Sequence, residues 1–209
     1  MRQHTNILIV GLIFGLFACN SSTGKQEAGL NKNPAVDSVQ LTDRPSEIAS
    51  VKDLRDECVR GQAEPVIKKS VFPKTTFTLQ PDSLTAIETV DFDNGDKLTL
   101  RNWGCEYYVL TFRFETSRFK ADVTDLKYWY VAVYKIITGM KQGIDAPVNI
   151  GRGLQALNEY ISKSAPDLTL HKEIDFGSDE IRDFVTVERI EKLTDKKYAL
   201  TVSFTTGPL

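Results

Sequence analysis

The sequence predicts an α+β domain: an antiparallel β-sheet, built from a meander and a C-terminal hairpin, with two main helices packed on one face. Three observations predict it. Strand-like segments alternate between residues 71 and 115, two helix-like segments follow between 122 and 164, and two more strand-like segments lie between 181 and 206. Consecutive strands joined by short turns pair antiparallel, and helices segregated between such runs favour α+β. We expect residues 46–209 to form this single domain.

The first strands are expected over residues 71–80, 84–92 and 97–102, with a turn at Asp93–Asp96 that contains Asn94-Gly95. The nearby carboxylates also suggest calcium, but Gly95 stands at position five instead of six of the EF-hand pattern, and Asn102 stands at position twelve in place of Glu. We therefore interpret this segment as a hairpin turn with solvated carboxylates. A further strand is expected from Cys105 to Glu115, with Tyr108, Leu110, Phe112 and Phe114 on its core face.

Two helices are predicted from the 3.6-residue spacing of apolar positions. The first has its apolar positions at residues 126, 129, 130, 133, 136, 137 and 140, and the second, from about 149 to 164, places Ile150, Leu154, Leu157 and Ile161 on one side. A short helix over residues 45–58 is also plausible from its spacing. The last two strands are expected over 181–193 and 198–206, with Tyr198, Leu200, Val202 and Phe204 facing the core and the other side facing solvent.

The N-terminus has the features of an export signal. Arg2 and His4 precede an apolar run from Ile7 to Ala18, which is shorter than the roughly 20 apolar residues that span a bilayer. The sequence Leu16-Phe17-Ala18-Cys19 then resembles the lipobox of bacterial lipoproteins. That resemblance implies cleavage of a signal peptide at residues 1–18, lipidation of Cys19 and acylation of the new N-terminus. Two or more acyl chains hold a protein firmly on a membrane.

The residues after Cys19 bear on location. Asn20-Ser21-Ser22 contains no acid, and in lipoproteins resembling this one an Asp at that place often means retention in the inner membrane. We therefore expect a lipid-anchored protein of the outer membrane in the bacterial cell envelope. Residues 19–45 lack aromatics and sustained apolar spacing, which is typical of a flexible tether. Without residues 1–18, 25 basic and 28 acidic residues remain, a balance that does not favour nucleic acid as a partner.

Two cysteines remain once Cys19 is assigned to lipid. Cys58 and Cys105 lie in one exported domain, and an oxidising compartment favours a disulfide between them. Closing a loop of 47 residues would stabilise the fold by about 4 kcal/mol on the chain-entropy model. A reactive thiol is the alternative, but Glu106 beside Cys105 favours the protonated thiol, so we prefer the disulfide.

Catalytic motifs are scarce in this sequence. Without residues 1–18 the chain keeps one histidine, His171, so a site that needs two imidazoles is excluded and most zinc sites are too. Glu106 and Glu115 are nine residues apart on the expected strand and on opposite faces, so they do not form an acid/base pair. We expect no catalytic residue, no metal and no cofactor.

The aromatic content is the strongest functional signal. Residues 103–134 hold ten of the twenty aromatic side chains, and Trp103, Tyr107 and Arg113 share one face of the expected strand, opposite to the core. Trp, Tyr and Arg are enriched in binding hot spots, so these residues are the candidate binding surface. The alternative is that a loop or the Cys58 segment covers them as a second small core.

These observations favour a membrane-anchored envelope lipoprotein that binds a protein or small-molecule ligand without catalysis, including the inhibitor or immunity type that masks another protein. A hydrolase that uses carboxylates or His171 is one alternative. A structural component of the envelope is another.

Overall fold

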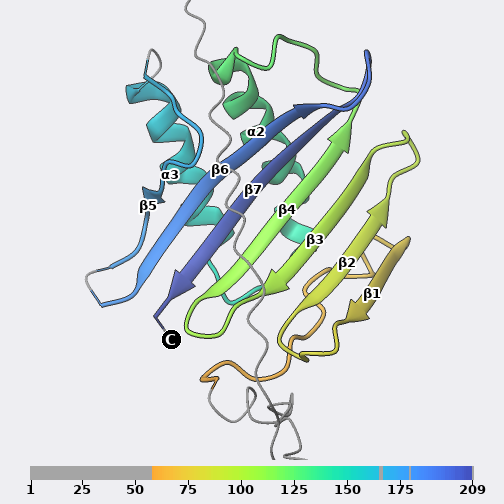
Figure 1. The fold of residues 1–209 in the computed structure, drawn as a ribbon, viewed down its shortest axis with the longest axis vertical. Coiled ribbons are helices and arrows are strands. Elements are labelled where there is room, and N and C mark those ends of the chain that lie inside the picture. Colours follow the sequence, from red (N-terminus) through yellow and green to blue (C-terminus); the bar gives the residue numbers. More distant parts are fainter. Residues whose placement is uncertain (1–57, 165–166, 179, 209) are drawn as a thin grey trace, which may run out of the picture. The chain divides into compact units, whose positions relative to one another are not determined.

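The computed structural model describes residues 58–164, 167–178 and 180–208. The signal peptide, Cys19, the tether and most of the helix expected over residues 45–58 lie outside the described residues. Within them, seven strands form one sheet in the order β1-β2-β3-β4-β7-β6-β5, and every neighbouring pair is antiparallel (Figure 1). With two α-helices between β4 and β5, the α+β class is confirmed.

The strands are β1 (Thr75–Leu79), β2 (Ala86–Asp91), β3 (Lys97–Trp103), β4 (Tyr108–Thr116), β5 (Ile174–Asp175), β6 (Arg182–Lys192) and β7 (Tyr198–Gly207). The first four form the predicted meander, and β6 and β7 form the predicted hairpin. The two parts join through the pairing of β4 with β7, which runs from Tyr108 opposite Thr206 to Thr116 opposite Tyr198. The two-residue strand β5, which was not predicted, adds an edge beside β6.

One face of the sheet carries the core. On β4 and β7 the alternate residues predicted to face the core are buried, and the same holds for neighbouring positions of β3 and β6. The largest of these fully buried side chains on the sheet are Leu98, Leu100, Leu110, Phe112, Leu200 and Phe204. Apolar side chains at every second position are what a half-buried strand requires, so the sequence pattern predicts this face correctly.

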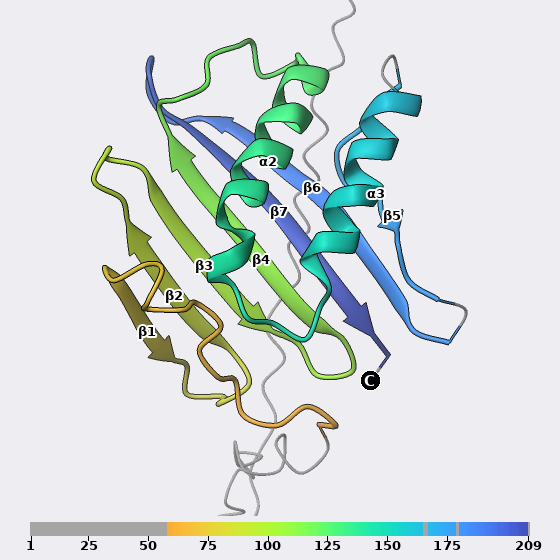
Figure 2. The same cartoon turned by 180° about the vertical axis from the view of Figure 1, so that it is seen from behind.

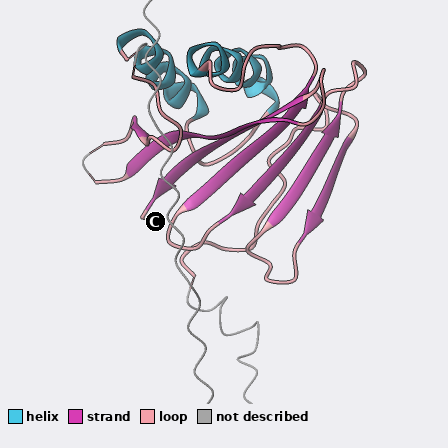
Figure 3. Ribbon diagram, turned by 45° about the horizontal axis from the view of Figure 1, so that its top comes forward, coloured by secondary structure: helices cyan, strands magenta, loops and turns pink. Residues whose placement is uncertain are grey.

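The helices α2 (Leu126–Met140) and α3 (Ile150–Lys163) match the predicted segments, and η1 (Lys141–Gly143) is a short 3₁₀ turn after α2. Of the predicted α2 positions all but Leu126 are buried. The ring centroid of Trp129 on α2 lies 4.7 Å from that of Tyr198 on β7. Figure 2 gives the view in which both helices stand in front of the strands. A Cβ atom at Gly153 of α3 would lie 2.7 Å from the ring of Phe204, so this glycine permits close helix–sheet contact. Figure 3 distinguishes the helices from the strands by colour.

A segment that we call the strap, residues 60–68, connects three parts of the fold. Ala63 donates its backbone N–H to Ser83 in the β1–β2 turn, Lys68 donates to Gly143 at the end of η1, and the Val66 carbonyl accepts from Asp145. The predicted Cys58–Cys105 disulfide is confirmed, and it ties the chain just before the strap to the β3–β4 turn. The strap therefore holds both strand turns against the connection between the helices.

Glu88 of β2 is fully buried beneath the strap. Its two carboxylate oxygens accept the backbone N–H groups of Val66 at 2.8 Å and Ile67 at 3.2 Å. Burial raises the pKa of Glu88 above its ordinary value, and these two hydrogen bonds only partly oppose that rise. A charged side chain thus replaces an apolar one at this end of the core because it satisfies two buried backbone donors.

The β3–β4 connection corrects the prediction of a strand that begins at Cys105. Residues 104–107 form a tight turn, and β4 begins only at Tyr108. Gly104 has φ +111°, and a Cβ there would lie 1.9 Å from the Tyr107 carbonyl oxygen, so only glycine fits. Trp103 consequently lies on β3, directly opposite Val109 of β4.

The β2–β3 turn confirms the hairpin interpretation and corrects one detail. Gly95 has φ +82°, as a tight turn requires. Asp96, expected to be solvated, is only 3% exposed because it pairs with Arg118, Nε to Oδ2 at 2.6 Å, and accepts from the Asn94 amide. Within the described ranges no group of three or more potential metal ligands is found.

The buried carboxyl of Glu88 gives a pH-dependent prediction. The pKa of this carboxyl is near 4.5 in the unfolded chain and higher in the folded protein. On acidification, the folded protein therefore binds a proton at Glu88 at a higher pH than the unfolded chain does. The unfolding free energy of the wild type, relative to that of Glu88→Gln, should therefore increase as the pH falls from neutral towards 4.5. Urea unfolding of both proteins across this range measures it.

Glu106→Gln is the matched control for losing one negative charge, since Glu106 is exposed in the β3–β4 turn. The prediction would be contradicted if the unfolding free energy of the wild type, relative to that of Glu88→Gln, decreased as the pH falls.

Candidate functional site

The second face of the sheet, which we call the Trp103 face, contains the residues that alternate with the core positions. On β7 these are small, namely Ala199, Thr201, Ser203 and Thr205, while the positions paired with them on β4 and β6 are mostly larger. Ser203 and Thr205 are only 6% and 5% exposed although they lie on this face. This face therefore has a shallow trough along β7, which the prediction of a plain solvent-facing side did not include.

A hollow of about 380 Å³ lies over this trough. Its aromatic walls are Trp103, Tyr107 and Phe184, its floor includes Val109, Ser203 and Thr205, and its charged lining consists of Glu173, Arg182 and Glu188. Concave sites with aromatic walls and a few polar groups are the usual form of ligand sites. Such a lining can stack on a flat or ring-shaped group while the hydroxyls and charges form hydrogen bonds to it.

Trp103 is held in place by hydrogen bonds across the sheet. Its indole Nε1 donates to Thr111 Oγ1 at 3.2 Å, and Thr111 Oγ1 lies 3.0 Å from Ser203 Oγ. The guanidinium carbon of Arg101 lies 4.6 Å from the indole centroid, a cation–π distance. A fixed aromatic side chain loses little conformational freedom when it binds a ligand, so Trp103 is suited to be an anchor.

The charged side of the hollow centres on Arg182. Its Nη2 lies 2.9 Å from a carboxylate oxygen of Glu173, and its Nε lies 3.8 Å from Asp175. The hydrogen bond to Glu173 raises the pKa of Arg182, and the guanidinium lies 5.2 Å from the Phe184 ring centroid. Glu173 and Arg182 therefore stand side by side at the rim of the hollow. Either side chain could bind a polar ligand in place of the other.

His171 lies next to this rim. Its Nδ1 is 3.2 Å from Glu188 Oε2, and its side chain is 69% exposed. Glu188 follows Val187 at the irregularity in the β6–β7 register, where an extra residue re-aims the side chains. The structure thus brings the histidine near the hollow through Glu188, in a position open to water.

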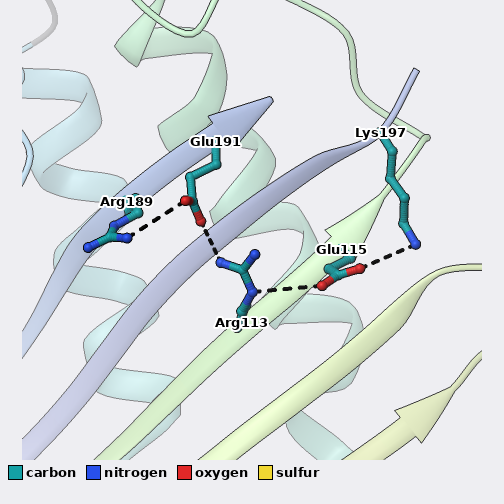
Figure 4. Close-up of polar contacts among 5 residues, drawn as sticks. All are labelled: Arg113, Glu115, Arg189, Glu191 and Lys197. Atoms are coloured by element: carbon teal, nitrogen blue, oxygen red, sulfur yellow. Dashed lines mark hydrogen bonds and ion pairs between the residues drawn. The ribbon is translucent and has the colours of Figure 1, made fainter. Parts of the chain in front are cut away.

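Arg113 belongs to a different part of the Trp103 face. Its Nη1 lies 2.5 Å from Glu191 Oε2 and its Nε 3.7 Å from Glu115 Oε1 (Figure 4). Arg189 contacts the other oxygen of Glu191 at 3.7 Å, and Lys197 contacts Glu115 at 3.3 Å. The hydrogen bond from Arg113 lowers the pKa of Glu191. Alternating charges from β6, the β6–β7 turn and β4 therefore satisfy Arg113 within the protein.

The three sequence-predicted binding residues accordingly separate. Trp103 and Tyr107 line one hollow, whereas Arg113 is engaged in the ion-pair network. The arginine in the hollow is Arg182, which sequence reasoning missed. Alternation along β6 places Phe184 opposite Thr205, but only the strand order brings that pair beside Trp103.

No protein-family model, curated protein or solved structure matches this chain. In the part of the chain that the structure describes, no helix is long and apolar enough to cross a membrane. The candidate site is therefore defined by its geometry alone: the hollow with Trp103, Tyr107, Phe184 and Arg182.

Because Arg113 and Phe112 lie on opposite faces of β4, their replacement should lower the unfolding free energy by different amounts. Arg113→Met removes partly exposed ion pairs and should lower the unfolding free energy by less than about 1 kcal/mol. Phe112→Ala, one residue away on the buried face, should cost about 3–5 kcal/mol. Urea unfolding of the two variants measures both values, and a larger loss for Arg113→Met than for Phe112→Ala would contradict this division.

Proposed function

We propose that this protein is a lipid-anchored lipoprotein of the bacterial envelope that binds a ligand, without catalysis, on its Trp103 face. The observation that carries the binding role is the hollow in which the fixed indole of Trp103 stands beside Tyr107, Phe184 and Arg182. Its volume of about 380 Å³ falls in the range of small-ligand sites, about 300–1,000 Å³. The same surface suits an inserted side chain of a partner protein.

The arrangement of the layers supports the choice of face. We infer that α2 and α3 pack on the core face alone, since Trp129 and Gly153 both contact β7 residues of that face. On this arrangement the Trp103 face is left for a ligand. Its partly exposed aromatic side chains and paired charges resemble the composition of binding surfaces more than that of a second core.

The anchor supports an envelope location. The export segment ending in Leu16-Phe17-Ala18-Cys19 resembles a lipobox, and a disulfide between the two remaining cysteines suits an oxidising compartment. The membrane partner is then the lipid bilayer at the N-terminus, with the outer membrane favoured by the absence of an acid after Cys19.

The hydrolase alternative would use the His171–Glu188 pair. That pair lies at 3.2 Å, but the histidine is 69% exposed, whereas catalytic carboxylates and imidazoles usually work in desolvated sites that tune their pKa. The binding role therefore accounts for more of the hollow, since it uses the three aromatic side chains and the Glu173–Arg182 pair together.

Replacement of Cys19 tests the anchor. In a bacterial host, the full chain should sediment with membranes and incorporate labelled fatty acid, while Cys19→Ser should be recovered in the soluble envelope fraction without label. Ser21→Ala is the control, because it changes a neighbouring residue and leaves the thiol. Membrane partitioning of Cys19→Ser equal to that of the wild type would refute lipidation at this residue.

Replacement of Trp103 tests the binding surface. A cross-linked pull-down from native envelopes should capture a partner with the wild type and lose most of it with Trp103→Ala, because the indole wall of the hollow is removed. Captured proteins are read by gel, and co-captured small molecules by mass spectrometry. Arg152→Gln, on the exposed side of α3, is the control and should bind as the wild type does. Equal capture by Trp103→Ala, with an unchanged melting temperature, would show that the hollow is not the contact surface.

A further inference from the structure

A second hollow, of about 260 Å³, lies between the strap and the other face of the sheet. Its lining includes Arg60, Pro65 and Val66 of the strap, Asn102 of β3, Tyr108 of β4 and Pro147 before α3. Asn102 precedes Trp103, and Tyr108 precedes Val109, so their side chains point away from the Trp103 face. The hollow is therefore separate from the site described above and does not depend on the function proposed for it.

Tyr108 is the unusual side chain of this hollow. It is 3% exposed, yet its Oη has no hydrogen-bond partner in the described part of the chain. Nearly all buried polar groups in proteins are paired, and each exception calls for an explanation. Burial raises the pKa of Tyr108 far above its ordinary value, so the phenol keeps its proton and is available as a donor.

Arg60 supplies a positive charge beside this hydroxyl. It is partly buried, and its guanidinium carbon lies 4.6 Å from the centroid of the Tyr108 ring. It donates to the side-chain oxygen of Asn102 and, at 3.4 Å, to the Gly104 carbonyl. Among the described residues it forms no ion pair with a carboxylate within 4.0 Å. Desolvation lowers the pKa of Arg60, because the fold removes part of the water around its guanidinium group.

Asp82, the acid whose charge acts on Arg60, already accepts hydrogen bonds from other groups. Asp82 contributes to the electrostatics of the guanidinium, but its carboxylate accepts from the Leu84 and Thr85 N–H groups and from the Thr85 hydroxyl. Two of the five guanidinium N–H groups at most serve Asn102 and Gly104. Donors therefore remain on Arg60 for an acceptor that the described residues do not provide.

We propose that this hollow binds the carboxylate group of a small organic acid with an apolar body. Arg60 would donate to the carboxylate in the planar, forked geometry that suits this group, and Tyr108 Oη would donate a further hydrogen bond. Pro65, Val66 and Pro147 would contact the apolar body. The volume is below that of sites for drug-sized molecules, so the acid is small.

The rim selects for a single negative charge. Glu64 and Asp145 also line the hollow, and both are exposed. Asp145 is partly neutralised by Lys68, Nζ to Oδ2 at 3.7 Å, while no such partner is found for Glu64 among the described residues. A second carboxylate on the ligand would meet these acids, so a monocarboxylate is favoured over a dicarboxylate.

The site is held open before any ligand arrives. The Cys58–Cys105 disulfide fixes the chain two residues before Arg60, and the Asn102 amide donates to the Glu64 carbonyl at 3.0 Å. Glu88 anchors Val66 from beneath. Groups that are already immobilised in the free protein lose little entropy on binding, so this frame favours affinity for a small ligand.

Titration calorimetry with benzoate and hexanoate tests the proposal, with benzamide and hexanamide as uncharged counterparts. The wild type should bind at least one of the two acids in the millimolar range or tighter, and the matching amide about tenfold more weakly or worse. Tyr108→Phe should weaken acid binding about tenfold or more, and Arg60→Gln should abolish it.

Two further measurements separate binding from a structural role. Tyr107→Phe removes a hydroxyl one residue away, in the other hollow, and should bind the acids as the wild type does. The melting temperature of Tyr108→Phe should be unchanged or higher, since the lost hydroxyl has no partner in the described residues. Failure of the wild type to bind both acids, equal binding by Tyr108→Phe, or equal loss in Tyr107→Phe would each overturn the proposal.

Discussion

The pairing of β4 with β7 is the interaction on which the rest of this structure depends. It joins the N-terminal meander to the C-terminal hairpin across a large separation in sequence, 92 residues between Thr111 and Ser203. Because side chains alternate with a period of two, a slip of one residue would exchange the two faces of β7. Phe204 would then face water and Ser203 the core. Burial of the large side chains on one face therefore fixes the register, and the register places both hollows.

The same alternation explains how two different sites lie so close together. Along β3, Asn102 faces the strap while Trp103 faces the opposite side, and along β4 Tyr108 and Val109 divide in the same way. The turn between these strands is short because Gly104 adopts a positive φ. It also carries Cys105, so the disulfide to Cys58 ties the chain just before the strap to this turn.

Local patterns predicted most of the elements. The period of two on β4 and β7, and the 3.6-residue spacing that includes Trp129 and Ile136 on α2, are strong because each element buries one side. The turn at residues 104–107 was missed, since Gly-Cys-Glu-Tyr lacks the Asn-Gly type of hairpin signal. The strand β5 has two residues, too few for any periodicity.

The candidate sites were harder to predict because they depend on strand order. Trp103 and Tyr107 were predicted to be binding residues from their side-chain type and their alternation along the expected strand. Arg113 was included for the same reason, but its ion-pair partner Glu191 is 78 residues away and could not be assigned from local spacing. Phe184 and Arg182 come beside Trp103 only because β7 lies between β4 and β6. Side-chain type was readable in the sequence, whereas adjacency across the sheet was not.

Three buried polar side chains near the strap, those of Glu88, Asn102 and Tyr108, differ in whether they stabilise the fold. Glu88 and Asn102 are buried, but each binds strap backbone: Glu88 accepts two N–H groups and Asn102 donates to the Glu64 carbonyl. Stability alone accounts for both, since they satisfy groups that would otherwise be buried unpaired. Tyr108 satisfies nothing with its hydroxyl in the described residues, and a phenylalanine would fill the same space at a lower desolvation cost. On the proposal made above, this hydroxyl takes its partner from a bound carboxylate that the adjacent Arg60 also contacts.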